Sequence, residues 1–467
     1  MIKWLKLLKK KKAPAKVKNA KLKSAKVKNV RSASDHARND ARIIPRSEHG
    51  ISRKNIDTHA IKVLYRLHNA GFQACLVGGA VRDLLIGVIP KDFDVATDAT
   101  PEQVNALFRN CRLIGRRFRL AHVHFGRQII EVATFRGDHD HTTMGSQDES
   151  GRIVRDNVFG EIGDDVWRRD FTANALYYDI SDFSVIDYVD GFEDIKKQRL
   201  RLIGDVETRY REDPVRMLRA LRFSAKLGFE IDEECRAPIY ELGFLLADIP
   251  AARLYEEVLK LFHSGNALAS FKQLQDFDML KYLFPEAANS IAKDASIERL
   301  ITIAMQSTDD RIRKDLRVTP AFLLAVLLWD AVNVLAKEIM ENGMPYSVAI
   351  QKAATRVLSK QSASVSIPKR FSSTMRDIWG LQTRFHYRSG KRAQAVLEHE
   401  KFRAAYDFLC IRLEAGDDVA EDCKWWTDIQ EQSTDQQKNA LTFKAKKSKP
   451  RKRNKKSSKD KGKISGE

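Results

Sequence analysis

Residues 76–94 have the sequence LVGGAVRDLLIGVIPKDFD, in which a glycine pair precedes two aspartates that are separated by one residue. Gly78 and Gly79 let the backbone come close to a ligand, and their N–H groups are suited to holding phosphate oxygens. Arg82 is predicted to open the next helix, where a triphosphate would meet both its charge and the helix N-terminus. A glycine pair alone is typical of an ordinary turn, so the aspartates that follow decide the interpretation.

Asp92 and Asp94 occupy positions i and i+2 of a predicted extended segment, 92–97. Side chains at these positions point to the same face, so the two carboxylates would stand side by side. A divalent cation relieves their repulsion, and hard oxygen ligands of this kind select Mg²⁺. The whole stretch therefore predicts a phosphate-binding turn next to a magnesium site.

The surrounding pattern predicts short strands over 74–77 and 129–135, with a helix over 81–85. Thr100-Pro101-Glu102-Gln103 combines an N-cap, a proline at the first helical position and a capping-box glutamine, so a helix should begin there. From about residue 205 onward, helical periodicity replaces the strand pattern. The sequence thus predicts the α+β class, with a mixed head followed by an all-helical body.

Charge is concentrated at the two ends of the chain, which has 467 residues and a net charge of +20. Residues 1–30 contain twelve lysines and no acid, and residues 444–463 contain twelve lysines or arginines and one acid. Such segments are typical of disordered tails that bind polyanions by counterion release, or that only confer solubility. The first eight residues are also compatible with a basic amphipathic turn at a membrane surface or in a transit peptide.

Other features exclude several classes of protein. No stretch approaches ~18 uninterrupted apolar residues, so stable membrane insertion is not expected. The five cysteines form no CxxC pair, which argues against a disulfide scaffold and a zinc ribbon and favours a reducing, cytoplasmic setting.

Three further segments, taken together with the glycine pair and the Asp92-Phe93-Asp94 motif, resemble a known family. They are Arg168-Arg169-Asp170-Phe171-Thr172-Ala173-Asn174, Asp187-Tyr188-Val189-Asp190-Gly191-Phe192-Glu193-Asp194-Ile195 and Arg211-Glu212-Asp213-Pro214-Val215-Arg216-Met217-Leu218-Arg219-Ala220. Together these motifs resemble the class II branch of the polymerase-β-like nucleotidyltransferases. That branch holds bacterial poly(A) polymerases and tRNA CCA-adding enzymes, and the resemblance is dense over about residues 70–300.

Within this branch, the segment FRNCRLIGRRFRLAHV at 108–123 resembles the bacterial poly(A) polymerases. The segments 367–370 (IPKR) and 390–393 (GKRA), together with the basic tail, are similar to the same group. The resemblance implies template-independent addition of AMP from ATP to RNA 3′ ends, in RNA processing and decay. CCA addition to tRNA is the alternative within the family, and a catalytically inactive RNA-binding adaptor is the alternative of another class.

The resemblance also implies how the chain is divided and what it contacts. We expect a basic extension over 1–45, a nucleotidyltransferase head over 46–204 and a helical neck over 205–290 that selects the base and binds RNA. A helical RNA-binding region over 291–435 and a basic tail over 436–467 complete the chain. RNA 3′ ends are the expected partner, and proteins of RNA decay or RNA chaperones are further candidates.

Site residues follow from the same motifs. Two ions of Mg²⁺, for which Mn²⁺ can substitute, are expected on Asp92 and Asp94, and Asp170 is the other expected catalytic acid. Pro214 is expected to begin a helix with Asp213 as its N-cap, and Asp213 with Arg216 to select the base. The expected nucleotide-binding residues are Gly78, Gly79, Arg82, Asp83, Arg169, Asp213, Arg216 and Arg219.

A third carboxylate is expected beside the metal-binding pair. Glu131 lies in the apolar strand segment 129–133, and a carboxylate buried there would be costly unless it were paired or bound to a metal. We therefore expect Glu131 to be a metal partner of Asp92 and Asp94. An acid that simply faces water from a strand is the alternative, and Asp170 is the rival third acid.

Overall fold

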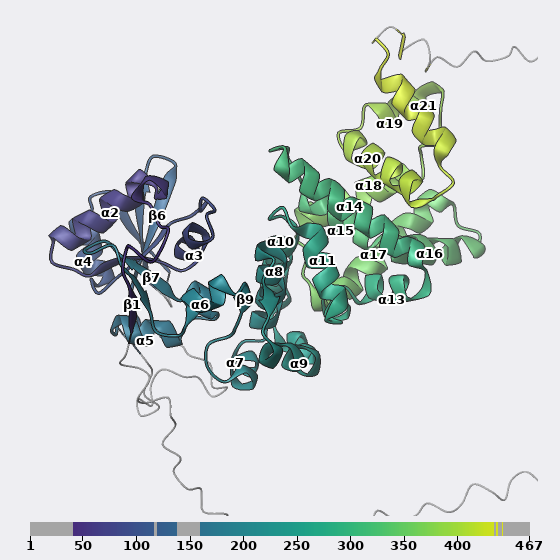
Figure 1. Ribbon diagram of the computed structural model, residues 1–467. Coiled ribbons are helices and arrows are strands. Elements are labelled where there is room, and N and C mark those ends of the chain that lie inside the picture. The colour runs from purple at the N-terminus through teal and green to yellow at the C-terminus, as the bar shows by residue number, and fades with distance from the viewer. Residues whose placement is uncertain (1–40, 116–118, 138–158, 434–435, 438–440, 442–467) are drawn as a thin grey trace, which may run out of the picture.

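The computed structural model describes residues 41–115, 119–137, 159–433, 436–437 and 441. The molecule is elongated, with a mixed α/β head at one end and helices over the rest of its length (Figure 1). The basic segments 1–30 and 444–463, and part of the 108–123 segment, lie outside the described residues. The predicted α+β class, with a head and a helical body, is confirmed.

The head is built on an eight-stranded sheet in the order β1-β8-β7-β2-β3-β6-β5-β4. Only β3 and β6 pair in parallel; all other neighbouring strands of this sheet are antiparallel. The strands are β1 (Arg42–Ile44), β2 (Ala74–Val77), β3 (Asp94–Thr97), β4 (Cys111–Ile114), β5 (Leu120–Phe125), β6 (Gln128–Thr134), β7 (Leu176–Asp179) and β8 (Val185–Asp187).

Both faces of the sheet are covered because its central strands are apolar on both sides. In β2, Ala74 and Leu76 belong to the large core shared with helix α2, whereas Cys75 and Val77 belong to a separate cluster with helix α5. Such double burial explains why β2 is a continuous apolar run rather than an alternating one. The helices of the head are α2 (Thr58–Asn69), α3 (Gly79–Leu85), α4 (Pro101–Leu107), α5 (Ile162–Trp167) and α6 (Gly191–Lys196), with 3₁₀ turns η1 (Arg53–Asn55) and η2 (Thr172–Asn174).

Local sequence signals set several element boundaries. β2 has the predicted bounds, and α4 begins with the predicted capping box, in which Thr100 and Gln103 each accept the other's backbone N–H. Helix α3 begins at Gly79, earlier than the predicted start at Val81. Strand β3 begins at Asp94, so Asp92 precedes the strand. These two shifts move Arg82 away from a helix start and separate Asp92 from the sheet.

The neck and body are helical, and their cores are continuous with that of the head. A short parallel pair, β9 (Arg199–Leu200) with β10 (Glu230–Ile231), joins the head to the neck. The neck helices are α7 (Val206–Glu212), α8 (Val215–Leu227), α9 (Glu233–Leu242), η3 (Gly243–Asp248), α10 (Ala251–Phe262), α11 (Ala267–Asp276), α12 (Leu280–Leu283) and α13 (Pro285–Lys293). Helix α8 packs against α10 and α11.

The remaining helices extend the chain away from the head (Figure 1). They are α14 (Ala295–Arg313), α15 (Pro320–Leu327), α16 (Trp329–Glu341), α17 (Tyr346–Ser364), α18 (Lys369–Gln382), α19 (Gly390–Leu397), α20 (Phe402–Ala415) and α21 (Ala420–Gln430). Helices α19 to α21 contribute to a separate hydrophobic cluster around Trp426. None of the described helices combines the length and the apolar character that crossing a bilayer would require.

Candidate active site

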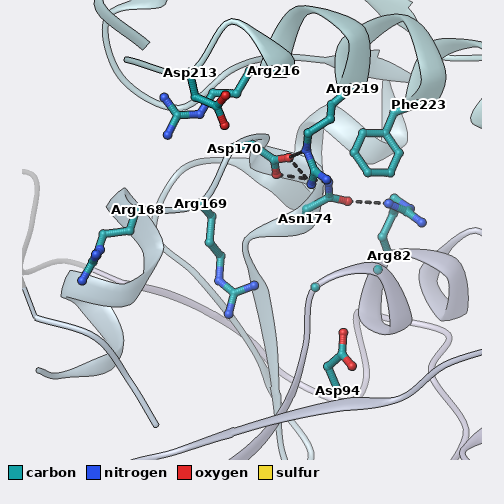
Figure 2. A pocket seen from close by; sticks show the side chains of 12 residues that line it. Arg82, Asp94, Arg168, Arg169, Asp170, Asn174, Asp213, Arg216, Arg219 and Phe223 are labelled. Atoms are coloured by element: carbon teal, nitrogen blue, oxygen red, sulfur yellow. Dashed lines mark hydrogen bonds and ion pairs between the residues drawn. The ribbon is translucent and has the colours of Figure 1, made fainter. Parts of the chain in front are cut away.

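A pocket of about 430 Å³ lies where the head meets the neck. Its lining comes from α3 and β3, from the segment 168–174 and from the start of α8. Figure 2 shows Asp94 on one side, Asp213 and Arg216 on the other, and Arg169 between them. The lining residues are Gly78, Gly79, Arg82, Asp94, Arg168, Arg169, Asp170, Asn174, Asp213, Arg216, Arg219 and Phe223. Five arginines against three aspartates give a cationic cavity of the size that ligands occupy, which suits a polyphosphate.

Gly78 forms a turn where the sequence predicts phosphate binding. It has a φ of 71° and immediately precedes α3, a conformation that favours glycine. A Cβ at this position would lie 3.5 Å from Nη1 of Arg169. That distance is an ordinary van der Waals contact, so the positive φ rather than a lack of space is what calls for glycine at this turn.

Asp94, at the start of β3, is the pocket acid that the sheet carries. Burial by the surrounding protein, followed by the negative charges of Glu131 and Asp92, raises the pKa of Asp94 to about 6. Glu131 is near because β3 and β6 run in parallel, with Val95 opposite Val132. The negative charges of Glu131 and Asp92 thus act on Asp94, which is the one of these three carboxylates that lines the cavity.

The expectation that Glu131 is buried was wrong. Its side chain is 50% exposed and lies 3.6 Å from Nε2 of His122, which faces it from β5. The strand has an open face at this position, so the cost of burying a charge no longer argues for a metal. The argument that Glu131 takes part in the site now rests on its proximity to Asp94. Within the described residues, no group of three or more Asp, Glu, His or Cys side chains is preassembled to hold a metal ion.

Arg169 is aimed by two buried groups that the sequence analysis did not identify. Nη2 of Arg169 donates to Oδ2 of Asp165 at 2.8 Å, and Nε donates to the Tyr177 hydroxyl at 2.8 Å. Burial alone would lower the pKa of Arg169, but the interactions with Tyr177 and with the Asp165 carboxylate raise it above its ordinary value. The guanidinium is therefore a permanent cation in a fixed position beside the glycine turn.

Asp170 faces the neck rather than Asp94. Nε of Arg219, on α8, donates to Oδ2 of Asp170 at 2.7 Å, and the N–H of Phe171 donates to Oδ1 at 2.9 Å. Burial would raise the pKa of Asp170, but the charge of Arg219 and its hydrogen bond hold that pKa below the usual value. The Asp170–Arg219 pair is a direct link between the head and α8.

Arg82 lines the pocket, but its guanidinium is largely engaged by the protein. It is 2% exposed, its Nε donates to Oδ1 of Asp83 at 2.8 Å, and its Nη1 donates to the side chain of Asn174. Asp83 does not line the pocket; it lies between Arg82 and Lys226 of α8, whose Nζ is 3.6 Å away. The geometry therefore makes Asp83 a support for Arg82.

Asp213 and Arg216, the residues predicted to select the base, occupy the α7–α8 corner. Asp213 is not the N-cap of α8: it ends α7, Pro214 is the N-cap, and Oδ1 of Asp213 accepts the N–H of Val215 at 3.2 Å. Nη1 of Arg216 donates to the backbone oxygen of Arg209 at 2.6 Å and to Oε2 of Glu212 at 2.9 Å. The side chains of Asp213 and Arg216 both line the cavity, and these hydrogen bonds fix their orientations.

The structure adds Arg168, Asn174 and Phe223 to the predicted pocket residues. Arg168 and Asn174 lie within the quoted 168–174 motif, so the motif itself was a signal for them. Phe223 lies on α8 two turns beyond Arg216, where an apolar residue is indistinguishable from a core position. Asp92 and Glu131 were predicted as ligands but do not line the cavity.

The fold and this pocket define a nucleotidyltransferase with a helical neck and body, and comparisons with known proteins specify the family. The matching family descriptions are "Poly A polymerase head domain" over 74–201, "Probable RNA and SrmB- binding site of polymerase A" over 228–291 and "Polymerase A arginine-rich C-terminus" over 342–460. The chain is 50% identical over 414 residues to poly(A) polymerase I of Salmonella typhimurium, covering 87% of this chain and 89% of that protein. It is 42% identical over 415 residues to the Haemophilus influenzae protein of the same name, covering 86% and 91%. The chain belongs to the poly(A) polymerase family.

Solved structures support the same fold at lower sequence identity. The Thermotoga maritima CCA-adding enzyme complexed with tRNA is 20% identical, with a TM-score of 0.52, and the match covers 80% of this chain and 82% of that one. At this identity the likeness concerns the fold alone.

Proposed function

We propose that this protein adds AMP from ATP to RNA 3′ ends without a template. The observation that carries the proposal is one cationic pocket that joins the Gly78 turn and Asp94 to Asp213 and Arg216. A nucleotide can place its triphosphate among the arginines beside the turn, while its base reaches the α7–α8 corner. The membership in the poly(A) polymerase family supports the choice of reaction.

The residues present fit a divalent cation held through oxygen atoms. The pKa of Asp94 is raised first by desolvation and then by the negative charges of Glu131 and Asp92, and a bound cation would offset both effects. Mg²⁺ is commonly held by one or two carboxylates together with substrate phosphates, so a preassembled cluster of three acids is not required. We propose Asp94 and Asp92 as ligands of a two-ion Mg²⁺ site, with Glu131 as their partner and Mn²⁺ as a substitute. When bound, the cations would activate the RNA hydroxyl and stabilise the oxygens of the leaving pyrophosphate.

The protein groups position the reactants. Arg169 is suited to the triphosphate because Asp165 and Tyr177 fix it next to the glycine turn. Asp213 and Arg216 present an acceptor and donors for one edge of adenine. Asp170 is bound to Arg219, so we propose that Asp170 acts by holding α8 against the head, and that Glu131 is the third acid.

The remaining predictions on organisation and partners stay proposals. We propose the head, neck and body boundaries given above, a cytoplasmic location and contacts with proteins of RNA decay or RNA chaperones. The five free cysteines support the cytoplasmic location, and the family description that names SrmB supports the contacts with other proteins.

The direct test is primer extension with a generic RNA, the purified full chain and each of the four nucleoside triphosphates in a separate reaction. Long tails from ATP alone are expected, in Mg²⁺ or Mn²⁺ and in the presence of a zinc-selective chelator. Addition that needs CTP and ends after three nucleotides would indicate CCA addition instead. No incorporation under any condition would favour the RNA-binding adaptor.

A further inference from the structure

The ring of Phe223 lies among the arginines of the pocket. This residue is on α8, lines the cavity and is 8% exposed. Three guanidiniums lie over the ring, at 4.3 Å from its centre for Arg222, 5.3 Å for Arg219 and 5.4 Å for Arg82. Arg82 belongs to α3 of the head, whereas the other two belong to the neck, and Figure 2 shows the ring beside Arg219 and Arg82. One side chain of the neck therefore contacts cations from both parts of the protein.

The head also fixes the position of this ring. Phe171, which is fully buried in the 168–174 segment, meets Phe223 edge to face, with the ring centres 5.6 Å apart and an angle of 80° between the ring planes. Phe171 directly follows Asp170, whose carboxylate binds Arg219 of α8. The aromatic contact and the ion pair thus join the same two segments, and together they hold the ring at the wall of the pocket.

The guanidiniums around the ring repel one another. Arg82 and Arg219 each bind an acid, but Nε of Arg222 is buried, finds no hydrogen-bond partner among the described residues and lies 3.8 Å from Oε2 of Glu257. Burial, and then the charge of Arg219, lower the pKa of Arg222. An aromatic ring attracts cations with the partial negative charge of its face, and it does so more strongly where water is excluded. The ring of Phe223 therefore offsets part of the repulsion in this cluster.

We propose that Phe223 is a positioning residue for nucleotide binding, and that its ring holds the guanidiniums of Arg82 and Arg219 in place for the triphosphate. The proposal rests on the proposed function, because it takes that triphosphate as the ligand of the pocket. A wall of cations that is assembled before the nucleotide arrives binds it more tightly, since like charges need not be brought together during binding. The base is expected at Asp213 and Arg216, so the ring should affect the affinity for phosphates and not the affinity for the base.

A series of fluorinated side chains tests the ring without removing it. Each fluorine draws electron density from the ring face and weakens its attraction for cations, while the size and the apolar character change little. Mono-, di- and trifluorophenylalanine are therefore introduced at position 223 of the full-length protein. Phe223→Leu, which keeps an apolar side chain and removes the ring, completes the set.

The chain supplies a matched control for the fluorinated series. Phe385 is also a buried phenylalanine, but its ring packs against those of Phe402 and Trp426 in the separate cluster of the C-terminal helices. It does not line the pocket. Trifluorophenylalanine at position 385 thus makes the same chemical change away from the arginines of the site.

The measurement is the displacement of a fluorescent ATP analogue by ATP, by inorganic tripolyphosphate and by adenosine, with Mg²⁺ present and no RNA. We expect the dissociation constants of ATP and tripolyphosphate to rise with the number of fluorines, by about fivefold for the trifluoro variant and further for Phe223→Leu. The dissociation constant of adenosine should not change in the fluorinated series, and the control should bind all three ligands like the wild type. In primer extension, the KM for ATP should rise in the same order while kcat changes little.

A dissociation constant of tripolyphosphate that does not change with fluorine number would overturn the proposal, as would a rise of the same size in the position-385 control. Equal weakening of adenosine and tripolyphosphate would overturn it too, because the ring would then only maintain the fold of the pocket. Failure of the wild type to incorporate AMP, with the graded binding series intact, would instead count against the proposed function. Thermal unfolding establishes that each variant is folded, and the fluorinated series decides the matter even if Phe223→Leu does not fold.

Discussion

At the scale of the residue, Asp94 is the carboxylate of the pocket whose pKa the surroundings raise. Although the side chain of Asp94 is exposed toward the pocket, desolvation by the surrounding protein, and then the charges of Glu131 and Asp92, raise its pKa from the ordinary value of 3.8 to about 6. The fold therefore disfavours the ionised form, so Asp94 destabilises the metal-free protein above about pH 6, and this penalty disappears as the pH falls toward 4. The carboxylate that we propose as a metal ligand is therefore one that lowers the stability of the metal-free protein.

Asp94→Asn should therefore lower activity while it raises the stability of the metal-free protein. We expect AMP incorporation to fall more than ~10²-fold, because a ligand of the catalytic cation is lost. The Tm of the metal-free variant should exceed that of the wild type at pH 7.5, and the difference should shrink at pH 4.5. Asp248→Asn, which removes an exposed carboxylate outside the pocket, serves as the control. Retention of more than about a tenth of the activity would contradict the assigned role.

At the scale of the element, the start of α6 fixes the segment that carries Arg169 and Asp170. The buried carboxylate of Asp187 accepts the N–H groups of Val189, Gly191 and Phe192, at 3.0, 3.1 and 2.9 Å. A Cβ on Gly191 would lie 2.2 Å from the backbone oxygen of Thr172, two residues after Asp170. The motif at 187–195 thus forms a close backbone contact between α6 and η2.

Gly191→Ala should therefore destabilise the head and reduce activity together. Since the obstacle is backbone, α6 or η2 has to move, and we expect a loss of about 3 kcal/mol in the free energy of unfolding, measured with urea. Gly50→Ala is the control, because nothing lies within 4 Å of its added Cβ, and it should change stability by less than about 0.5 kcal/mol. A Gly191 variant as stable as the Gly50 variant would show that the contact is not rigid.

At the scale of the whole molecule, the basic ends should govern affinity for RNA rather than chemistry. Residues 1–30 and 444–463 carry twelve basic groups each, and the catalytic motifs lie between them. Removing both segments should raise the KM for RNA and flatten its dependence on salt, because fewer counterions are released on binding. The kcat at saturating RNA should change little. Steady-state kinetics over a salt series measures both quantities, and an unchanged salt slope would contradict the prediction.

The sequence predicted those features that depend on neighbouring residues, and it failed where distant segments decide the surroundings. The strand at 74–77 and the capping box at Thr100 were predicted because their signals are local. The burial of Glu131 was wrong because exposure depends on what covers that face of the sheet. The partners of Asp213 and Asp170, which are Arg253 and Arg219, come from helices more than 35 residues further along the chain. No local pattern encodes such pairs.

The central claim is that Asp213 and Arg216 select adenine at the pocket where Asp94 acts. Arg216 is held by Glu212 and by the backbone of Arg209, so its remaining donors are aimed and would be left unpaired by a wrong base. The most direct test is kcat/KM for ATP, CTP, GTP and UTP in the wild type and in Arg216→Ala. We predict that the preference for ATP falls far more than the rate with the best nucleotide. A fall of all four values by the same factor, with the preference for ATP intact, would contradict the claim and assign Arg216 to phosphate binding or to the fold.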